Sequence, residues 1–414
     1  MVPMSLRILA PPTSDTSEAP SLVLQCDARK YMFNVGEGTT RVSAQHRASN
    51  MRVDHIFLTR VASETMGGVP GLLMTLADGG RKSIDIHAPP NLLYALAATR
   101  LYARRDTMAL NAHEIEVREP HVCYQDEYVQ IHSVPLVPAQ HRSLYTDIAE
   151  KGPALDVKAQ LSSPKALRGS QAKAWYECIL RDAWTNSERT SPGPARSAHL
   201  LPPPPVPYAP DGPEPGRQAA VLAYICAGHI QRGKFDAEQA MALGVPPGKS
   251  FARLARGETI TISRPVAWEQ MDQDARQAWL RAQQRRDPGP ASMPVEDVQV
   301  ASQEVVGASR AGPVFFYLHV PTPAHVEALV QSDAFAPYTH GANQHLAPEQ
   351  RRTPHVMLHA APQSVWVDER YRSWRQRFGP DCHHLLANRD VCADQLTYTS
   401  NAVSLDRLSE LDAQ

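Results

Sequence analysis

The side chains in this sequence that could bind a metal or attack a substrate do not assemble into a complete site. His355 and His359 are four apart on an expected strand, so their side chains face the same side. Cys382 and the two histidines that follow it form a second small group. Zinc takes at least three protein ligands, so we expect structural or surface histidines in both groups. The sequence also contains no Gly-x-Ser-x-Gly elbow and no recognisable frame of paired carboxylates.

A short basic segment is the strongest candidate for a binding function. It contains Lys234, Pro246, Pro247, Gly248, Lys249, Arg253 and Arg256. Basic side chains on a loop suit contacts to phosphate groups, which are independent of base sequence and sensitive to salt. A solvated surface with ordinary charges is the alternative interpretation. The whole chain has 42 basic and 43 acidic residues, so a case for nucleic-acid binding must rest on such local segments.

A glycine-containing turn, Gly36-Glu37-Gly38, follows a short apolar strand. Glycines let a backbone approach an anion closely, as in phosphate-binding loops. A single Gly-x-Gly is weak evidence for such a loop, however, and the Glu37 carboxylate would repel phosphate. We therefore expect a tight structural turn between a strand and a helix.

A second apolar strand, residues 53–59, runs into the sequence Arg60-Val-Ala-Ser-Glu-Thr65. Arg60 cannot ligate a metal because its guanidinium carries only hydrogen-bond donors. Ala62 has no ligand atom, and Glu64 alone cannot hold zinc. Arg60 and Glu64 either form a salt bridge in a pocket or lie on a loop that faces solvent.

Strands and helices are expected to alternate along most of the chain. Apolar runs predict strands at residues 30–34, 53–59, 219–226, 314–318 and 355–359, and helices at 67–77, 91–102 and 364–378. Asp236 is a suitable N-cap for a helix that ends at Gly244. Alternation that includes β-hairpins predicts two sheets packed face to face, with helices outside.

Four segments, in order, resemble the amino-terminal half of the long form of ribonuclease Z, the tRNA 3′ endonuclease of the metallo-β-lactamase superfamily. They are residues 31–76, 220–262, 312–321 and 355–380, with the motifs Gly233-Lys-Phe-Asp236, Leu243-Gly-Val-Pro-Pro-Gly248, Ala360-Ala-Pro-Gln-Ser-Val365 and Arg377-Phe-Gly-Pro380. The resemblance implies an α/β fold. It is a metallo-β-lactamase-like four-layer αββα sandwich with a degenerate metal site, a protruding arm and disordered insertions.

The resemblance also implies that the metal site has been lost. Where the family's catalytic half has a His-x-His-x-Asp-His motif, this sequence has Arg60, Ala62, Glu64 and Thr65, and Asn34 replaces an aspartate beside the metal. We therefore expect the chain to bind no zinc and to have no catalytic residues of its own. Zinc and phosphodiester hydrolysis are expected in a catalytic carboxyl-terminal half, in the same or a separate polypeptide.

The implied role of this chain is to bind the substrate of a ribonuclease Z that removes the 3′ trailer of precursor tRNA. The resemblance places the tRNA-binding arm at Lys234 and at residues 246–256, where Lys249 stands in place of the proline of many members. A catalytically inactive scaffold for a protein partner is the alternative, because Pro202-Pro-Pro-Pro205 could occupy an aromatic groove. A pure scaffold would have no need of the basic segment.

The expected organisation has five parts. Residues 1–137 begin the β-lactamase-like domain, 138–217 form a proline-rich and mostly disordered insertion, 218–275 hold a strand and the arm, 276–311 form a linker, and 312–414 close the domain. The insertion is inferred from ten prolines between Ser191 and Arg217. Together with balanced charge and 36 prolines, this predicts a packed core with irregular insertions.

The cellular compartment is predicted only in outline. Six scattered cysteines without CxxC spacing indicate reduced thiols. No apolar run is long enough for a membrane span, and no targeting helix is visible at the amino terminus. Nucleus or cytoplasm is therefore expected, and the family resemblance adds the mitochondrion.

Overall fold

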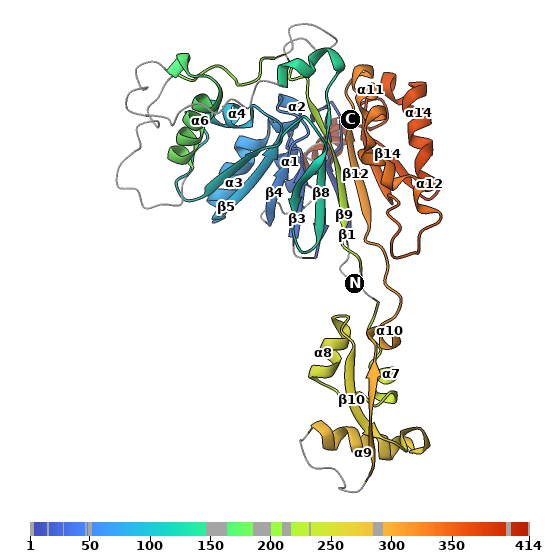
Figure 1. Ribbon diagram of the computed structural model, residues 1–414. Coiled ribbons are helices and arrows are strands. Elements are labelled where there is room, and N and C mark those ends of the chain that lie inside the picture. Colours follow the sequence, from blue (N-terminus) through green and yellow to red (C-terminus); the bar gives the residue numbers. More distant parts are fainter. Residues whose placement is uncertain are drawn as a thin grey trace. The chain divides into compact units, whose positions relative to one another are not determined.

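The structure, a computed structural model, divides into two compact units, which are described separately (Figure 1). Unit 1 comprises Met1–His229, Pro313–His345 and Arg352–Gln414, and unit 2 comprises Ile230–Gly312 and Leu346–Arg351. The residues described are 4–14, 16–27, 29–45, 48, 52–145, 164–184, 200–208, 217–231, 233–284, 293–394 and 399–412.

Unit 1 contains two six-stranded mixed sheets. Sheet 1 has the order β1 (Met4–Ala10), β2 (Ser21–Cys26), β3 (Arg29–Phe33), β4 (Val53–Phe57), β5 (Ser83–Ala88) and β6 (Ala109–Glu114). The strands β1 to β3 form an antiparallel meander, and β3 to β6 run parallel. Helices connect the parallel strands, as parallel neighbours require a crossover.

Sheet 2 is assembled from segments far apart in the sequence. Its order is β14 (His383–Leu386), β13 (Val356–Ala360), β12 (Val314–His319), β9 (Val221–Gly228), β8 (Val129–Leu136) and β7 (His121–Gln125). The pairs β12–β13 and β13–β14 are parallel, and the remaining pairs are antiparallel. Unit 2 is inserted between β9 and β12, which are nevertheless hydrogen-bonded neighbours.

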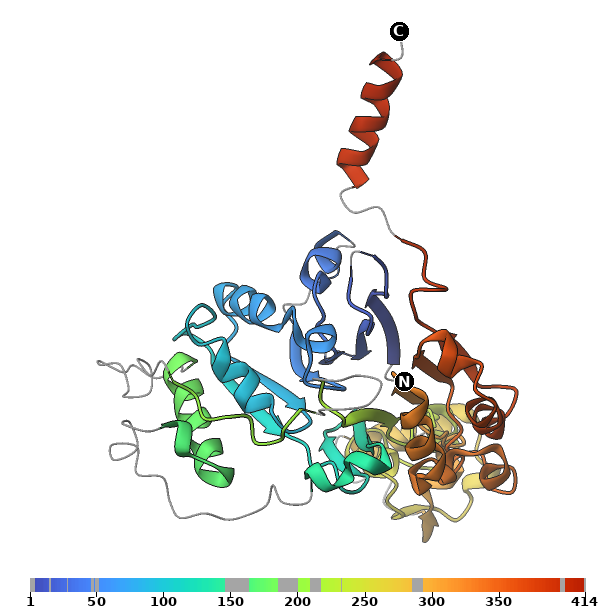
Figure 2. The ribbon, with the colours of Figure 1, turned by 90° about the horizontal axis from the view of Figure 1, so that it is seen from above.

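Helices cover the outer faces of both sheets (Figures 1 and 2). The α-helices of unit 1 are α1 (Thr39–Gln45), α2 (Ser63–Met66), α3 (Val69–Asp78), α4 (Leu92–Ala98), α6 (Gly169–Ala183), α11 (Pro323–Gln331), α12 (His340–Asn343), α13 (Gln363–Trp366), α14 (Glu369–Arg375) and α15 (Thr399–Asp412). Four 3-10 helices span Ala139–Tyr145, Pro164–Ala166, Asp333–Tyr338 and Gln376–Phe378. The predicted helix 364–378 is thus divided into three short pieces.

Three hydrophobic cores hold these layers together. The central core lies between the sheets and contains Phe33, Phe57, Tyr224, Phe315 and Tyr317. A second core packs α3, α4 and α6 against the outer face of sheet 1. A third packs α11 and α14 against sheet 2. This is the four-layer αββα sandwich that the sequence predicts, because apolar strands buried on both faces need helices on each outer side.

The glycines around residue 36 serve close backbone approach. A Cβ atom on Gly36 would lie 2.4 Å from Ser17 Oγ, and one on Gly68 would lie 2.4 Å from the Gly36 carbonyl oxygen. The Val35 N–H donates to the Thr65 carbonyl at 2.7 Å, which joins the turn to the end of α2. The structural interpretation of the Gly36-Glu37-Gly38 turn is therefore confirmed.

Part of the segment 138–217 is folded, contrary to the expectation of a mostly disordered insertion. Trp175, Tyr176 and Ile179 of α6 are buried in the core on sheet 1, and α6 packs on α4. Burial of two large aromatic side chains stabilises this packing. The rest of the prediction falls on residues 146–163, 185–199 and 209–216, which lie outside the described residues.

Unit 2 is a two-stranded antiparallel ribbon with short helices. Its elements are α7 (Ala237–Ala242), α8 (Lys249–Ala255), β10 (Ile260–Pro265), a 3-10 helix (Trp268–Gln270), α9 (Gln273–Gln284), β11 (Val295–Val300) and α10 (Ser302–Val305). Asp236 caps α7, since its Oδ1 accepts from the Glu238 and Gln239 N–H groups, as predicted.

The prediction that residues 276–311 form a linker is wrong. They contain most of α9, the strand β11 and the short helix α10. β11 pairs with β10 from Ile260 opposite Val300 to Pro265 opposite Val295. The sequence 295–300 shows little periodicity, so this strand forms because a partner 35 residues earlier pairs with it along its whole length.

Candidate functional site

The position of the degenerate metal motif lies where β3, β4 and β12 end on the same side of unit 1. Asn34 follows β3 in the left-handed region, with φ 55°. Its Oδ1 accepts from the Thr59 N–H at 2.9 Å, and its Nδ2 donates to the Tyr317 hydroxyl at 2.8 Å. The Thr59 hydroxyl also lies 2.8 Å from His319 Nδ1. Asn34 therefore binds neighbouring side chains and backbone across both sheets.

Arg60 occupies the space next to this network and is 1% exposed. Its Nε donates to the Gln218 carbonyl at 2.7 Å, and its Nη1 lies 3.5 Å from Glu64 Oε1. Glu64 is also buried and lies 3.5 Å from Arg217 Nη1. Of the two alternatives that the sequence leaves open, the structure has the buried Arg60–Glu64 salt bridge and not the solvent-facing loop.

The four motif positions offer no set of ligands for zinc. Arg60 presents only donors, Ala62 has no ligand atom, and the Thr65 hydroxyl donates to the Arg60 carbonyl at 2.5 Å. Among the described residues, no group of three or more histidine, cysteine, aspartate or glutamate side chains is placed to hold a metal ion. The residues present at this position therefore do not fit the zinc site of a hydrolase.

His319 stands at the end of β12, and sequence reasoning did not single it out. Burial lowers its pKa to about 3, and the positive charges of Arg60, His325 and Arg217 act in the same direction. It is therefore neutral at physiological pH. No local motif marks His319, because its position beside Thr59 depends on the pairing of strands from both ends of the chain.

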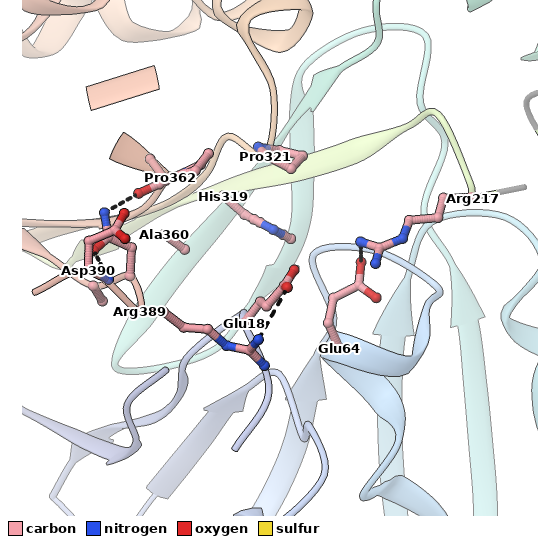
Figure 3. A pocket seen from close by; sticks show the side chains of 12 residues that line it. Glu18, Glu64, Arg217, His319, Pro321, Ala360, Pro362, Arg389 and Asp390 are labelled. Atoms are coloured by element: carbon pink, nitrogen blue, oxygen red, sulfur yellow. Dashed lines mark hydrogen bonds and ion pairs between the residues drawn. The ribbon is translucent and has the colours of Figure 1, made fainter. Parts of the chain in front are cut away.

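Two hollows that share lining residues open beside this network, and Figure 3 shows the smaller of them. One has a volume of about 210 Å³ and the other about 370 Å³, and both are lined by Glu18, Glu64, Arg217 and Arg389. Glu18 lies 3.7 Å from Arg389, so each carboxylate has a guanidinium nearby. In Figure 3 the His319 ring points toward the space between the two ion pairs. The four residues that line both hollows are thus charged, with two carboxylates and two guanidinium groups.

The histidines on β13 and β14 form an internal contact. His359 is buried and lies 2.5 Å from the Tyr371 hydroxyl and 2.9 Å from His384 Nδ1. Burial is the main cause that lowers the pKa of His359 well below its ordinary value. His355 Nδ1 accepts from the Val314 N–H at 3.3 Å. These contacts support the structural interpretation of both histidine groups.

The residues of the predicted arm all lie in unit 2. Lys249 and Arg253 of α8 and its C-cap residue Arg256 follow the spacing i, i+4, i+7, so these exposed residues lie on one side of the helix. Leu254 is buried on the opposite face, and the Phe251 ring packs at a tilt of 54° against Phe235, with ring centroids 4.9 Å apart. The apolar contacts fix the helix so that its basic face points to solvent.

The turn before α8 brings Pro246 and Pro247 to its amino end. Gly248 has φ 119°, which disfavours any other residue, and nothing lies within 4 Å of its Cβ position. Lys234 is exposed on a segment whose carbonyl accepts from the Gly307 N–H. Arg253 Nε donates to Glu258 Oε2 at 2.7 Å, so one of the four cations is partly neutralised.

The sequence of this chain is similar to those of known tRNase Z proteins. The sequence model of the tRNase Z endonuclease family matches residues 7–68. Zinc phosphodiesterase ELAC protein 2 of Rattus norvegicus is 26% identical over 393 residues, which cover 93% of this chain and 39% of that protein. The mitochondrial tRNAse Z TRZ4 of Arabidopsis thaliana is 27% identical and covers 92% of this chain and 31% of that protein. This chain is a homologue of long-form tRNase Z.

Comparison of the fold with solved structures agrees with the sequence comparison. The crystal structure of a long-form RNase Z from yeast covers 95% of this chain and 38% of its own, with a TM-score of 0.56 and 14% identity. The chain is homologous to the amino-terminal half of long-form tRNase Z and spans less than half the length of these relatives. It has a metallo-β-lactamase-like fold.

The polyproline stretch of this tRNase Z homologue is bound within its own fold. Pro202 is buried, and the Tyr176 hydroxyl donates to the carbonyls of Pro202 and Pro203. Val206 exchanges two hydrogen bonds with the Asn91 side chain, at 2.8 and 2.9 Å. These contacts compete with capture of the stretch by an aromatic groove, which weakens the argument for a scaffold.

Two further predictions concern the thiols and the membrane. All six cysteines are free, and burial raises the pKa of Cys26 to about 12, so that thiol stays protonated. Within the described part of the chain, no helix combines the length and apolar character that a membrane span requires. The cellular compartment stays a prediction.

Proposed function

We propose that this chain is the non-catalytic, substrate-binding half of a tRNase Z, and that it holds precursor tRNA for a catalytic half that removes the 3′ trailer. The observation that carries the proposal is the basic face of α8, formed by Lys249, Arg253 and Arg256. Three cations at this spacing can follow a phosphate backbone without reading bases. An enzyme that accepts every tRNA needs such sequence-independent contacts.

The residues at the degenerate metal position support a separation of substrate binding, in this chain, from hydrolysis, in a catalytic half. The Arg60 guanidinium fills the position from which a hydrolase would hold zinc, so the chemistry requires a second half. Such a half would supply zinc ions that activate water for phosphodiester hydrolysis. The present chain would supply binding energy and orientation. By itself it would bind precursor tRNA and leave it intact.

The test is a gel-shift titration of the purified chain with a precursor tRNA across a salt series. We expect binding that weakens steeply with salt, and unchanged RNA on a denaturing gel after incubation with zinc. The triple variant Lys249→Ala/Arg253→Ala/Arg256→Ala should reduce the slope of log K against log salt by about 1 for each lost phosphate contact. The variant Arg104→Ala/Arg372→Ala/Arg407→Ala removes the same charge from exposed positions in unit 1 and should bind like the native chain.

Equal losses in the two triple variants would mean that only net charge matters, and would refute a specific role for α8. An unchanged salt slope in the α8 variant would have the same meaning. Mitochondrial or nuclear location is tested separately with a tagged chain in cells, since two Arabidopsis thaliana relatives carry mitochondrial names.

A further inference from the structure

The two hollows beside the degenerate metal position differ in their walls. Apolar side chains line much of the smaller one, namely Pro321, Ala360, Ala361, Pro362 and Ala387. The larger one is lined by the hydroxyl-bearing side chains of Ser14, Thr16, Ser17 and Ser63. A flat apolar group fits the first environment, and a polyhydroxylated group fits the second.

Four charged residues, Glu18, Glu64, Arg217 and Arg389, line both hollows. A nucleoside has the same division, because a flat base is joined to a hydroxyl-rich ribose. From this match of shape and chemistry, we propose that the paired hollows bind one guanosine nucleotide, with guanine in the smaller hollow and ribose in the larger.

The charged residues point to guanine among the common bases. Guanine presents two adjacent donors, N1–H and the 2-amino group, which suit a single carboxylate. Its O6 and N7 acceptors suit a guanidinium. Adenine and cytosine place an acceptor beside their amino group, and that acceptor would face the carboxylate unfavourably.

Glu18 is the carboxylate for this role. Its side chain is 58% exposed, and its ion pair with Arg389 is long, at 3.7 Å. Glu64 is 8% exposed and is engaged by both Arg60 and Arg217. Arg217, at the opposite side of the mouth and 41% exposed, is the donor for O6 and N7. The Glu18–Arg389 ion pair is exposed on both sides, and exposed pairs of this length contribute little, so a base can replace the contact of Glu18 with Arg389 at low cost.

His319 contributes by staying neutral. Its low pKa, caused by burial, means that it adds no positive charge behind the base. The smaller hollow thus has a neutral imidazole beside its apolar side chains, and Asn388 and the Asp390 carboxylate complete its polar lining. A neutral heteroaromatic ring suits it better than a free phosphate or a metal ion.

The inference rests on the proposed RNA-binding role only for the source of the nucleotide, namely an unpaired guanosine of a bound RNA. Its test uses free nucleotides, so that it can fail independently. Isothermal titration of the full chain with GMP should give a dissociation constant below about 1 mM. AMP and CMP should bind at least about tenfold more weakly, as expected for loss of a charged hydrogen bond.

The variant Glu18→Gln keeps the size of the side chain and places a donor opposite the guanine donors. We expect it to remove the preference for GMP over AMP. The matched control is Glu369→Gln, which breaks another exposed ion pair, with Arg372 at 3.2 Å, and should keep the preference. Arg217→Gln serves as a second variant should Glu18→Gln fold poorly, and should weaken GMP binding by about tenfold.

Three results would each overturn the proposal. They are no GMP binding at several times the expected dissociation constant, equal affinity for GMP and AMP, and a preference for GMP that survives in the Glu18 variant. The triple α8 variant should bind GMP normally while losing tRNA affinity. If the native chain binds GMP but does not bind tRNA, the proposed function is refuted and the nucleotide site is retained.

Discussion

The Arg60 Nε donates a hydrogen bond of 2.7 Å to the carbonyl oxygen of Gln218, although the two residues are separated by 158 positions in the sequence. The Gln218 side chain returns the contact, since its Oε1 accepts from the Val61 N–H at 3.0 Å. A buried cation thus joins the loop after β4 to the segment that enters β9.

Replacement of Arg60 by alanine should destabilise the protein by about 3 kcal/mol. The reason is that Glu64 and the Gln218 carbonyl would stay buried after loss of their common partner. Urea unfolding of native protein and variant measures the difference. Arg372→Ala, which removes an exposed guanidinium, should change stability by less than about 0.5 kcal/mol. A similar small effect in the Arg60 variant would show that the buried network is not stabilising.

Removal of metal should have no effect on this chain. The positions Arg60, Ala62, Glu64 and Thr65 offer at most one zinc ligand, so neither folding nor binding should depend on zinc. We expect the thermal unfolding midpoint to be the same with zinc and with EDTA. Elemental analysis after dialysis should find far less than one zinc per chain. A stoichiometric, EDTA-sensitive zinc would contradict the assignment of this position as degenerate.

Stability should fall as the pH is lowered from about 6.5 toward 3. Burial lowers the pKa of His87 and of His319 to about 3, whereas an unfolded histidine titrates near 6.5. Between these values the unfolded chain binds more protons than the folded chain, so protonation favours unfolding. Above pH 6.5 both states are neutral at these residues and the effect vanishes.

The pH effect can be separated from general acid sensitivity with one variant. His319→Asn removes one of the buried imidazoles with a lowered pKa, so the loss of thermal stability between pH 7 and pH 4 should become smaller. His345→Gln, at an exposed position, should leave the pH dependence unchanged. Identical slopes in all three proteins would show that His319 does not contribute.

Trp175→Ala should destabilise unit 1 by about 4 kcal/mol, because Trp175 is fully buried in the core on sheet 1. Glu177→Ala lies on the exposed face of the same helix and should be nearly neutral. The measurement is again urea unfolding. It tests whether α6 is part of the folded body, since a helix in a disordered insertion would tolerate both substitutions equally.

The sequence was sufficient to predict those caps, turns and strands that depend only on neighbouring residues. Asp236 as an N-cap, the glycine turn at residue 36 and the strands β3, β4, β9, β12 and β13 were predictable, because side-chain chemistry and apolar runs act over a few residues. That Arg60 and Ala62 cannot ligate zinc also follows from residue type alone, since neither side chain carries an atom that can bind a metal in any conformation. The order of motifs along the sequence was sufficient to indicate the superfamily of the chain.

Only the tertiary structure decided the rest. The sequence alone predicts a linker at β11, because the pairing of this strand with β10 stabilises it and its own residue pattern does not. The burial of Trp175 depends on contact with α4 and sheet 1. Glu18, Arg217, His319 and Arg389 come together from distant segments, so no spacing in the sequence could reveal the hollows that they line. Residue types are fixed by the sequence itself, whereas burial and the meeting of charges depend on which strands pair.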